Sequence, residues 1–365
     1  GRTVRLFPRQ TRRIMHVVAF PLALPGGATP GLRRPPLLPR APIASPLTSP
    51  PSTLHPRPST LDPRPSALTP PMSAGREFVG PYRLFHLIRA GALFEIWAVR
   101  PVAERTAYAM KWLPPGDRHT RQAAGELKHE FNVGKTIEHP KIIKTFDYGT
   151  GKDGTYLVME LFKTPNLKQQ IHEGIENLHW RLEEILDGAA AALDHLHEKG
   201  WVHRDVKPDN FLVSDDNDVR LIDFNLTQKI PKGLGKIFAG KSTVQGTYSY
   251  MSPEQIRGKA CDERADVYSF GVMVYELMSG KMPFTATSPS DLLNKHLRSK
   301  PSDLSMLQPN IQPEFAKLVH RMLEKDPKDR PDSLREFRRD LKAGRCFHIK
   351  PTKPEPKSEE DEEDG

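Results

Sequence analysis

The sequence of 365 residues predicts an α+β fold, with a small β-rich lobe followed by a larger helical lobe. The early part of the chain carries short apolar runs that indicate strands, at Glu95–Val99, Tyr108–Leu113 and Tyr156–Glu160. The later part carries longer helical patterns, at Arg181–Lys199, Arg264–Ser279 and Glu314–Glu324. Because strands come first and helices later, the two kinds of element are expected to be segregated.

One folded domain is expected over residues 82–343, with a first lobe at about 82–160 and a second at about 161–343. Residues 1–71 hold 17 of the 36 prolines, ten Arg and a single acid. Proline removes a backbone donor and does not fit inside a helix, so this Pro/Arg-rich extension is expected to be disordered. Alternatively, it recruits a proline-recognising partner, or it is not translated and Met72 starts the protein. Residues 351–365 hold seven acids and are expected to form a disordered acidic tail.

The composition argues against several classes of protein. The formal net charge is +9, but residues 1–71 carry +9 and residues 351–365 carry −5, which leaves +5 on the residues between. A charge this small on a domain gives no reason to expect a nucleic-acid partner. Two cysteines cannot form a disulfide scaffold or a cysteine-rich zinc module. The longest apolar stretch, Val17–Leu24, is interrupted by Pro21, so we expect no membrane span and a cytoplasmic protein.

The segment His203–Asn210, with the sequence HRDVKPDN, carries the strongest chemical signal. Asp223 follows 18 residues after Asp205, and two apolar runs between them flank the turn-like residues 215–218, which predicts a hairpin. The hairpin would bring Asn210 and Asp223 to one end, and two oxygen ligands side by side suit Mg²⁺. Asp205 would lie nearby and face an incoming hydroxyl. Any one of these acids alone is more simply a solvated surface residue, but the whole spaced string is not.

With these motifs, the sequence resembles the eukaryotic-type protein kinase family over roughly residues 82–343. HRDVKPDN resembles the catalytic loop, and Asp223-Phe224-Asn225 resembles the metal-binding DFG triplet. Further matches follow the family's order: Tyr108–Lys111 with the phosphate-binding Lys; Glu130, in a helical segment ending at His139-Pro140; Ser252-Pro253-Glu254; Asp266–Gly271 of the central helix; and Arg330, the partner of Glu254.

The resemblance implies a two-lobed kinase fold that binds ATP and Mg²⁺ and transfers the γ-phosphate to Ser or Thr hydroxyls of protein substrates. It assigns Lys111, oriented by Glu130, to the α/β-phosphates, Asn210 and Asp223 to Mg²⁺, Asp205 to the substrate hydroxyl and its proton, and Lys207 to the transferring phosphoryl group. The other nucleotide contacts are expected from Ile88, Gly91, Ile96, Ala109 and Leu212, with Met159 and Glu160 at the hinge. Lys207 and Gly246-Thr247 resemble the serine/threonine pattern.

Two departures from the family pattern keep a second class of function open. Only Gly91 remains of the three glycines in the nucleotide-covering loop, where Arg89 and Phe94 take the outer positions. Glycine lets a backbone approach phosphates closely, so this loop should clamp ATP less tightly. Asn225 replaces the glycine of DFG, and asparagine tolerates a positive φ better than most residues. The alternative to an active enzyme is a pseudokinase that acts as a nucleotide-binding or scaffolding module.

Arg204 precedes Asp205, and kinases with arginine there are commonly switched by phosphorylation in the segment that here runs from Asp223 to Glu254. This segment holds four lysines, and its acids stand only at its ends, so it should repel itself when unphosphorylated. A phosphate adds about −1.5 to −2 charges and would pair with Arg204. Thr243 is the first candidate and Ser242 the second, unless both are ordinary polar loop residues. Thr247 is expected to bond Asp205 and Lys207 instead.

Overall fold

The computed structural model describes residues 77–116, 118–231 and 247–355, all within one compact unit that spans Ser66–Gly365. The predicted Pro/Arg-rich extension, the acidic residues after Glu355 and the candidate phosphorylation sites Ser242 and Thr243 lie outside the described residues. In the part of the chain that is described, no helix is both long enough and apolar enough to cross a membrane. The cytoplasmic location and the lack of a nucleic-acid partner stay predictions.

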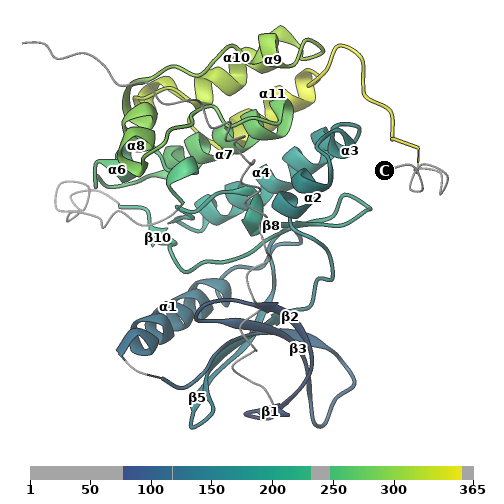
Figure 1. Ribbon diagram of the computed structural model, residues 1–365, viewed down its shortest axis with the longest axis vertical. Coiled ribbons are helices and arrows are strands. Elements are labelled where there is room, and N and C mark those ends of the chain that lie inside the picture. Colours follow the sequence, from purple (N-terminus) through teal and green to yellow (C-terminus); the bar gives the residue numbers. More distant parts are fainter. Residues whose placement is uncertain (1–76, 117, 232–246, 356–365) are drawn as a thin grey trace, which may run out of the picture. The chain divides into compact units, whose positions relative to one another are not determined.

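The β-rich part, at the bottom of Figure 1, is a six-stranded antiparallel sheet. Its strand order is β1-β2-β3-β4-β6-β5. Its strands are β1 (Phe78–Val79), β2 (Tyr82–Ala90), β3 (Glu95–Pro101), β4 (Tyr108–Leu113), β5 (Thr145–Gly151) and β6 (Gly154–Glu160). The three predicted strands fall within β3, β4 and β6. All strand neighbours along the chain pair as antiparallel ladders, apart from β4 and β5, which β6 separates.

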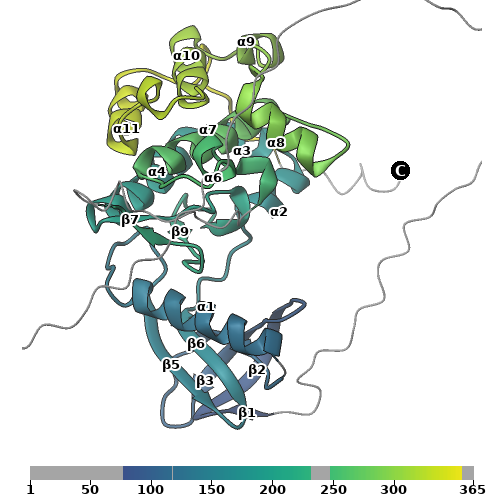
Figure 2. The ribbon, with the colours of Figure 1, turned by 90° about the vertical axis from the view of Figure 1, so that its left-hand side faces the viewer.

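Helix α1 (Arg118–Gly134) crosses one face of this sheet beside β5 and β6 (Figure 2). The contact is an apolar cluster, here called the sheet–helix cluster, formed by Leu113, Ala123, Leu127 and Leu157, with Phe94, Ala124, Phe131, Tyr148 and Met159 against it. The helix ends at Gly134, before the predicted end at His139-Pro140. A Cβ on Gly134 would lie 2.3 Å from the Thr145 hydroxyl, so glycine allows β5 to approach the end of the helix.

The larger part of the described chain is helical, with two short two-stranded antiparallel sheets, the β8–β9 hairpin and the pair of β7 with β10. Its elements in chain order are α2 (Leu167–Glu173), α3 (Glu176–His179), α4 (Leu182–Glu198), β7 (Trp201–Val202), η1 (Pro208–Asn210), β8 (Phe211–Val213), β9 (Val219–Leu221), β10 (Gln228–Lys229), η2 (Tyr248–Tyr250), α6 (Pro253–Ile256), α7 (Glu263–Ser279), α8 (Pro289–Arg298), α9 (Leu304–Leu307), α10 (Pro313–Met322), η3 (Pro327–Asp329) and α11 (Leu334–Ala343). Residues 265–278 of α7 are buried on every side, which makes α7 the central helix.

The packed region extends beyond the predicted limits of 82 and 343. Strand β1 begins at Phe78, and the segment after α11 packs back onto the helices. Cys346 and Phe347 are buried in the main apolar core, and the Cys346 N–H donates to Glu183 Oε1 of α4 at 2.8 Å. Lys350 pairs with Glu184 of the same helix at 3.3 Å. We refer to Gly344–Lys350 below as the C-terminal strap.

Candidate active site

The loop that carries Asp205 follows β7 and is held by the central helix. Asp266, fully buried near the start of α7, accepts the backbone N–H groups of His203 at 2.7 Å and Arg204 at 2.8 Å. It also accepts a 2.7 Å hydrogen bond from His197 Nε2 of α4. Although burial opposes ionisation, these donors hold the pKa of Asp266 below its usual range. The sequence placed Asp266 on the central helix but gave no sign of His197, because a contact across 69 positions leaves no local pattern.

This support explains how Arg204 keeps a left-handed backbone, with φ of +68°. Such a conformation costs a non-glycine residue about 1–2 kcal/mol, so the surrounding structure must hold it. The Gln255 side chain of α6 also donates to the Arg204 carbonyl at 2.8 Å. The loop of Asp205 is therefore fixed from two helices that lie far from it in sequence.

The carboxylate of Asp205 is surrounded by polar partners. Lys207 Nζ lies 2.7 Å from Asp205 Oδ2 and donates to Thr247 Oγ1 at 2.8 Å. The backbone and hydroxyl of Thr247 each donate to Asp205 Oδ1 at 3.3 Å, so the contacts predicted for Thr247 with both residues are present. The Asn210 amide nitrogen donates to the Asp205 carbonyl at 2.7 Å. These bonds fix the Asp205 side chain in one direction.

The predicted hairpin is present as β8 and β9. Phe211 of β8 pairs with Leu221 of β9 at one end, and Val213 pairs with Val219 at the other. The Ile222 N–H donates to the Asn210 carbonyl at 3.0 Å, which places Asn210 and Asp223 at one end of the hairpin. Because the amide nitrogen of Asn210 is turned toward Asp205, its amide oxygen points the other way. Asp223 adopts φ of +67°, a second left-handed residue in the site.

The donor set of Asp223 and Asn210 fits Mg²⁺, which prefers carboxylate and amide oxygens and takes its other ligands from water and phosphate. Burial raises the pKa of Asp223, but the positive charge of Lys111 opposes it and the pKa lies below its usual range, so the carboxylate is ionised. No group of three or more His, Cys, Asp or Glu side chains suited to a metal occurs among the described residues.

Lys111 of β4 contacts both helix α1 and the segment that begins at Asp223. Its Nζ lies 2.8 Å from Glu130 Oε2 of α1 and 3.4 Å from Asp223 Oδ1. Burial disfavours the charged amine, but the two carboxylates prevail and raise the pKa of Lys111. For Glu130, burial raises the pKa to about 7, although the positive charge of Lys111 opposes this increase. The pair is therefore a close ion pair whose acid member titrates near neutrality.

Four of the expected nucleotide contacts share one face of the sheet. In the ladders, Ile96 pairs with Lys111 and Ala109 pairs with Met159, and residues directly opposite each other present their side chains to the same face. Ile88 lies in the irregular stretch of the β2–β3 ladder and is 46% exposed. Leu212 lies on β8, beyond the sheet.

Glu160, at the end of β6, connects the sheet to the hairpin. Its carboxylate pairs with Arg220 of β9 at 3.1 Å and accepts the Lys144 N–H at 3.2 Å. Arg220 also stacks on Phe162, with its guanidinium carbon 4.6 Å from the ring centroid. The side chain of Glu160 is thus engaged in structural contacts, and its backbone N–H donates to the Lys144 carbonyl at 2.8 Å.

The loop expected to cover the nucleotide closes in a tight turn at Gly91. The Gly91 N–H donates to the Phe94 carbonyl at 2.9 Å, and a Cβ on Gly91 would stand 2.9 Å from that same oxygen. Glycine is therefore required for the tight turn itself. The Phe94 ring packs in the sheet–helix cluster, with its centroid 5.1 Å from Lys111 Nζ. From the sequence, Phe94 was expected only to keep the loop backbone away from the ATP phosphates, and its contact with Lys111 was not predicted.

Asn225 does not need the conformational freedom that the sequence argument gave it. Among the described non-glycine residues, positive φ values occur only at Arg204, Asn217 and Asp223. The backbone strain of the DFG-like triplet thus falls on Asp223, and the Asn225 N–H donates to Asp223 Oδ1 at 3.4 Å.

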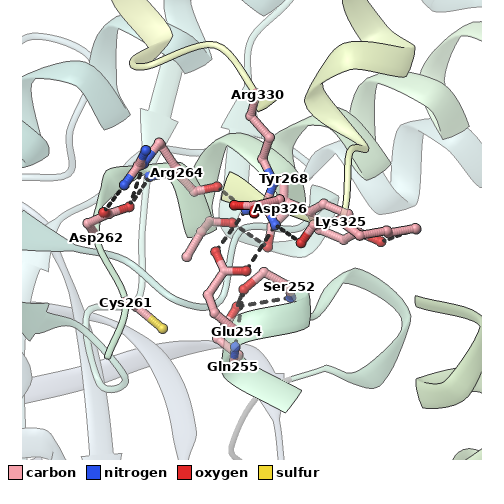
Figure 3. A network of polar contacts seen from close by, with 12 residues as sticks. Ser252, Glu254, Gln255, Cys261, Asp262, Arg264, Tyr268, Lys325, Asp326 and Arg330 are labelled. Carbon is pink, nitrogen blue, oxygen red and sulfur yellow. Dashed lines mark hydrogen bonds and ion pairs between the residues drawn. The ribbon is translucent and has the colours of Figure 1, made fainter. Parts of the chain in front are cut away.

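A buried ion pair anchors the end of the segment that begins at Asp223 (Figure 3). Arg330 donates to both carboxylate oxygens of Glu254, at 2.8 and 2.9 Å, and to the Arg264 carbonyl at 2.7 Å. Arg330 is 1% exposed, and its guanidinium carbon lies 4.9 Å from the Tyr268 ring centroid. The predicted pairing of Glu254 with Arg330 is present.

Comparison with known proteins gives a consistent result. The family model of the protein kinase domain matches residues 82–339. A probable serine/threonine-protein kinase of Streptomyces coelicolor is 31% identical over 278 residues, covering 74% of this chain and 41% of that protein. Serine/threonine-protein kinase pkn3 of Myxococcus xanthus is 31% identical over 283 residues, covering 74% and 51%. Serine/threonine-protein kinase PknB of Mycolicibacterium smegmatis is 30% identical over 264 residues, covering 71% and 42%.

The chain thus spans about half or less of the length of these relatives. The matched region contains the catalytic loop, the hairpin and the Lys111–Glu130 pair described above. The two-lobed α+β architecture predicted from the sequence agrees with this match. The chain belongs to the protein kinase family.

Proposed function

We propose that this chain is an active serine/threonine protein kinase, which transfers the γ-phosphoryl group of ATP to Ser or Thr hydroxyls of proteins. The observation that supports this most strongly is the joint placement of Lys111, Glu130 and Asp223, with Lys111 Nζ 2.8 Å and 3.4 Å from the two carboxylates. Phosphoryl transfer depends on positioning and charge neutralisation, and this arrangement supplies both.

In the proposed reaction, Asp205 orients the acceptor hydroxyl and takes its proton. Lys207 contributes a positive charge beside the same carboxylate, 2.7 Å away, where it would stabilise the transferring phosphoryl group. The bond between the γ-phosphorus and the bridging oxygen breaks, and the acceptor oxygen forms the new bond. The hydrogen bonds from Thr247 and Asn210 keep Asp205 ready for this role.

Asp223 and Asn210 would hold Mg²⁺, and Lys111 would contact the α/β-phosphates. Mg²⁺ bound at these oxygens would neutralise charge on the phosphates. Ile96, Ala109 and Met159 would provide an apolar surface for the adenine from one face of the sheet, with Leu212 opposite and Ile88 and Gly91 covering the nucleotide. The preference for Ser and Thr rests on Lys207 and its contact with Thr247.

The test uses the full chain, γ-labelled ATP, Mg²⁺ and peptides that offer Ser, Thr or Tyr as the only acceptor. Asp205→Asn should reduce transfer by about 10²–10⁴-fold, because it removes the base and keeps the shape of the side chain. Asp216→Asn, in the exposed turn of the hairpin, is the matched control and should transfer normally. Nucleotide binding without any transfer by the wild type would favour the pseudokinase alternative.

A further inference from the structure

His129 precedes Glu130 on α1 and contacts the segment that follows Asp223. Its Nε2–H donates to the Thr227 carbonyl at 2.7 Å, the shortest link between α1 and this segment among the contacts described here. Thr227 is 1% exposed, so its carbonyl has no ready replacement partner in water. The bond therefore ties the helix of Glu130 to the chain four residues beyond Asp223.

The His129 ring also contacts β7, the strand that leads into the loop of Asp205. The imidazole packs edge-to-face on Trp201 of β7, with ring centroids 6.2 Å apart. Lys229 Nζ lies 3.8 Å from the same indole centroid, and Lys229 pairs with Trp201 in the β7–β10 ladder. His129 thus stands where α1, the strand leading to Asp205 and the strand following Asp223 meet.

The turn between Asp223 and Thr227 is the part of the site that most needs such support. Asp223 holds a left-handed backbone with φ of +67°. The turn is closed by the Thr227 N–H, which donates to the Phe224 carbonyl at 3.2 Å. At the start of the turn, Lys111 Nζ lies 3.4 Å from Asp223 Oδ1 and 2.8 Å from Glu130 Oε2, so Glu130 and the adjacent His129 of α1 are linked to the two ends of the turn.

We propose that His129 is a positioning residue. Its hydrogen bond to the Thr227 carbonyl keeps the carboxylates of Glu130 and Asp223 in position around Lys111. Loss of this bond would let the turn relax at its far end and move the Asp223 carboxylate away from Lys111. This inference rests on the proposed kinase function, but the underlying juxtaposition can also be measured through nucleotide binding alone.

Two variants separate the hydrogen bond from the packing of the ring. His129→Phe keeps an aromatic ring against Trp201 and removes the donor, and His129→Gln keeps a donor near the Nε2 position and removes the ring. We expect kcat to fall about 5–30-fold in His129→Phe and to recover to within about threefold of wild type in His129→Gln. A purely structural role would give the opposite order. His172→Phe, on the exposed face of α2, is the control.

Affinity for ADP with and without Mg²⁺, measured by calorimetry, gives a readout that needs no turnover. The Mg²⁺-dependent gain in affinity should shrink in His129→Phe and return in His129→Gln. A failure of the wild type to transfer phosphate would count against the proposed function, and this binding comparison would still decide the role of His129. An unchanged Mg²⁺ gain in His129→Phe, or equal loss in both variants, would overturn the inference.

Discussion

Glu130 is the residue whose ionisation should set the acid limit of activity. Its pKa is raised to about 7 by burial, and only the carboxylate can pair with Lys111. Transfer should therefore decline as the pH falls through about 7. A pH–rate profile between pH 5.5 and 8.5 tests this, with Glu130→Gln as the comparison. An acid limb that persists unchanged in Glu130→Gln would contradict the assignment.

The same ionisation has the opposite effect on stability. A carboxyl group whose pKa is raised from 4.5 to about 7 on folding stabilises the folded state fully below pH 4.5, and this contribution is lost as the pH rises through 7. As the pH rises through about 7, ionisation of Glu130 should therefore increase activity and decrease the free energy of unfolding. Melting temperatures of wild type and Glu130→Gln across this interval should converge at low pH.

Arg89 and Phe94, the two bulky residues of the nucleotide-covering loop, should behave differently when replaced by glycine. Arg89 is exposed on β2, so Arg89→Gly should lower the KM for ATP by letting the backbone approach the phosphates. Phe94→Gly should instead lower the melting temperature, because it removes a ring from the sheet–helix cluster. ATP kinetics and thermal melts on both single variants distinguish the two effects. Equal responses from the two variants would show that the Phe94 contact has no energetic weight.

At this scale the sequence predicted partners better than conformations. The Lys111–Glu130 pair, the Thr247 contacts and the Glu254–Arg330 pair were implied by the resemblance to the kinase family, and all three are present. The roles given to these side chains stay predictions. The packing of Phe94, the bond of His129 and the position of the backbone strain at Asp223 depend on long-range contacts that no local pattern contains.

Among the elements, α1 carries a weakness in its own sequence. Gly125 lies in the middle of the helix, is exposed, and has open space where a Cβ would stand. Gly125→Ala should stabilise the protein by about 0.5–1 kcal/mol, because alanine loses less backbone entropy on forming a helix. Gly271 of α7 is the matched control, since its Cβ would lie 2.7 Å from Met322 Cβ. Thermal denaturation should show a gain for Gly125→Ala and a loss for Gly271→Ala, and a loss for both would contradict this account.

The elements themselves were largely visible in the sequence. Apolar runs located β3, β4 and β6, and the turn residues 215–218 located the β8–β9 hairpin. The end of α1 was placed too late, because the need for Gly134 beside Thr145 arises only once β5 is packed. Strand β1 has only two residues and lies before the predicted start of the domain, so its pairing with β2 could not be seen.

For the whole molecule, the Glu254–Arg330 pair joins segments 76 residues apart inside the helical part. Glu254→Gln would leave the guanidinium of Arg330 buried without its counter-charge, and we expect a loss of about 3–5 kcal/mol in the free energy of unfolding. Glu138→Gln breaks a pair with Lys144 whose acid is 87% exposed, and it should cost less than about 1 kcal/mol. Chemical denaturation of both variants measures the difference. Similar midpoints would show that the buried Glu254–Arg330 pair stabilises the protein no more than the exposed pair does.

The C-terminal strap has a consequence for mechanical force. A pull on the chain beyond Lys350 reaches Glu184 and Glu183 of α4 before it reaches α11, because the strap is bonded to α4 at both positions. Helix α4 leads directly into β7 and the loop of Asp205. The strap also bonds the segment before α10, because the His348 and Ile349 N–H groups donate to Asn310 at 2.8 and 2.9 Å. Tension on a tethered C-terminus would therefore load α4 and this segment together before it reached α11, and the burial of Phe347 would resist the detachment of the strap.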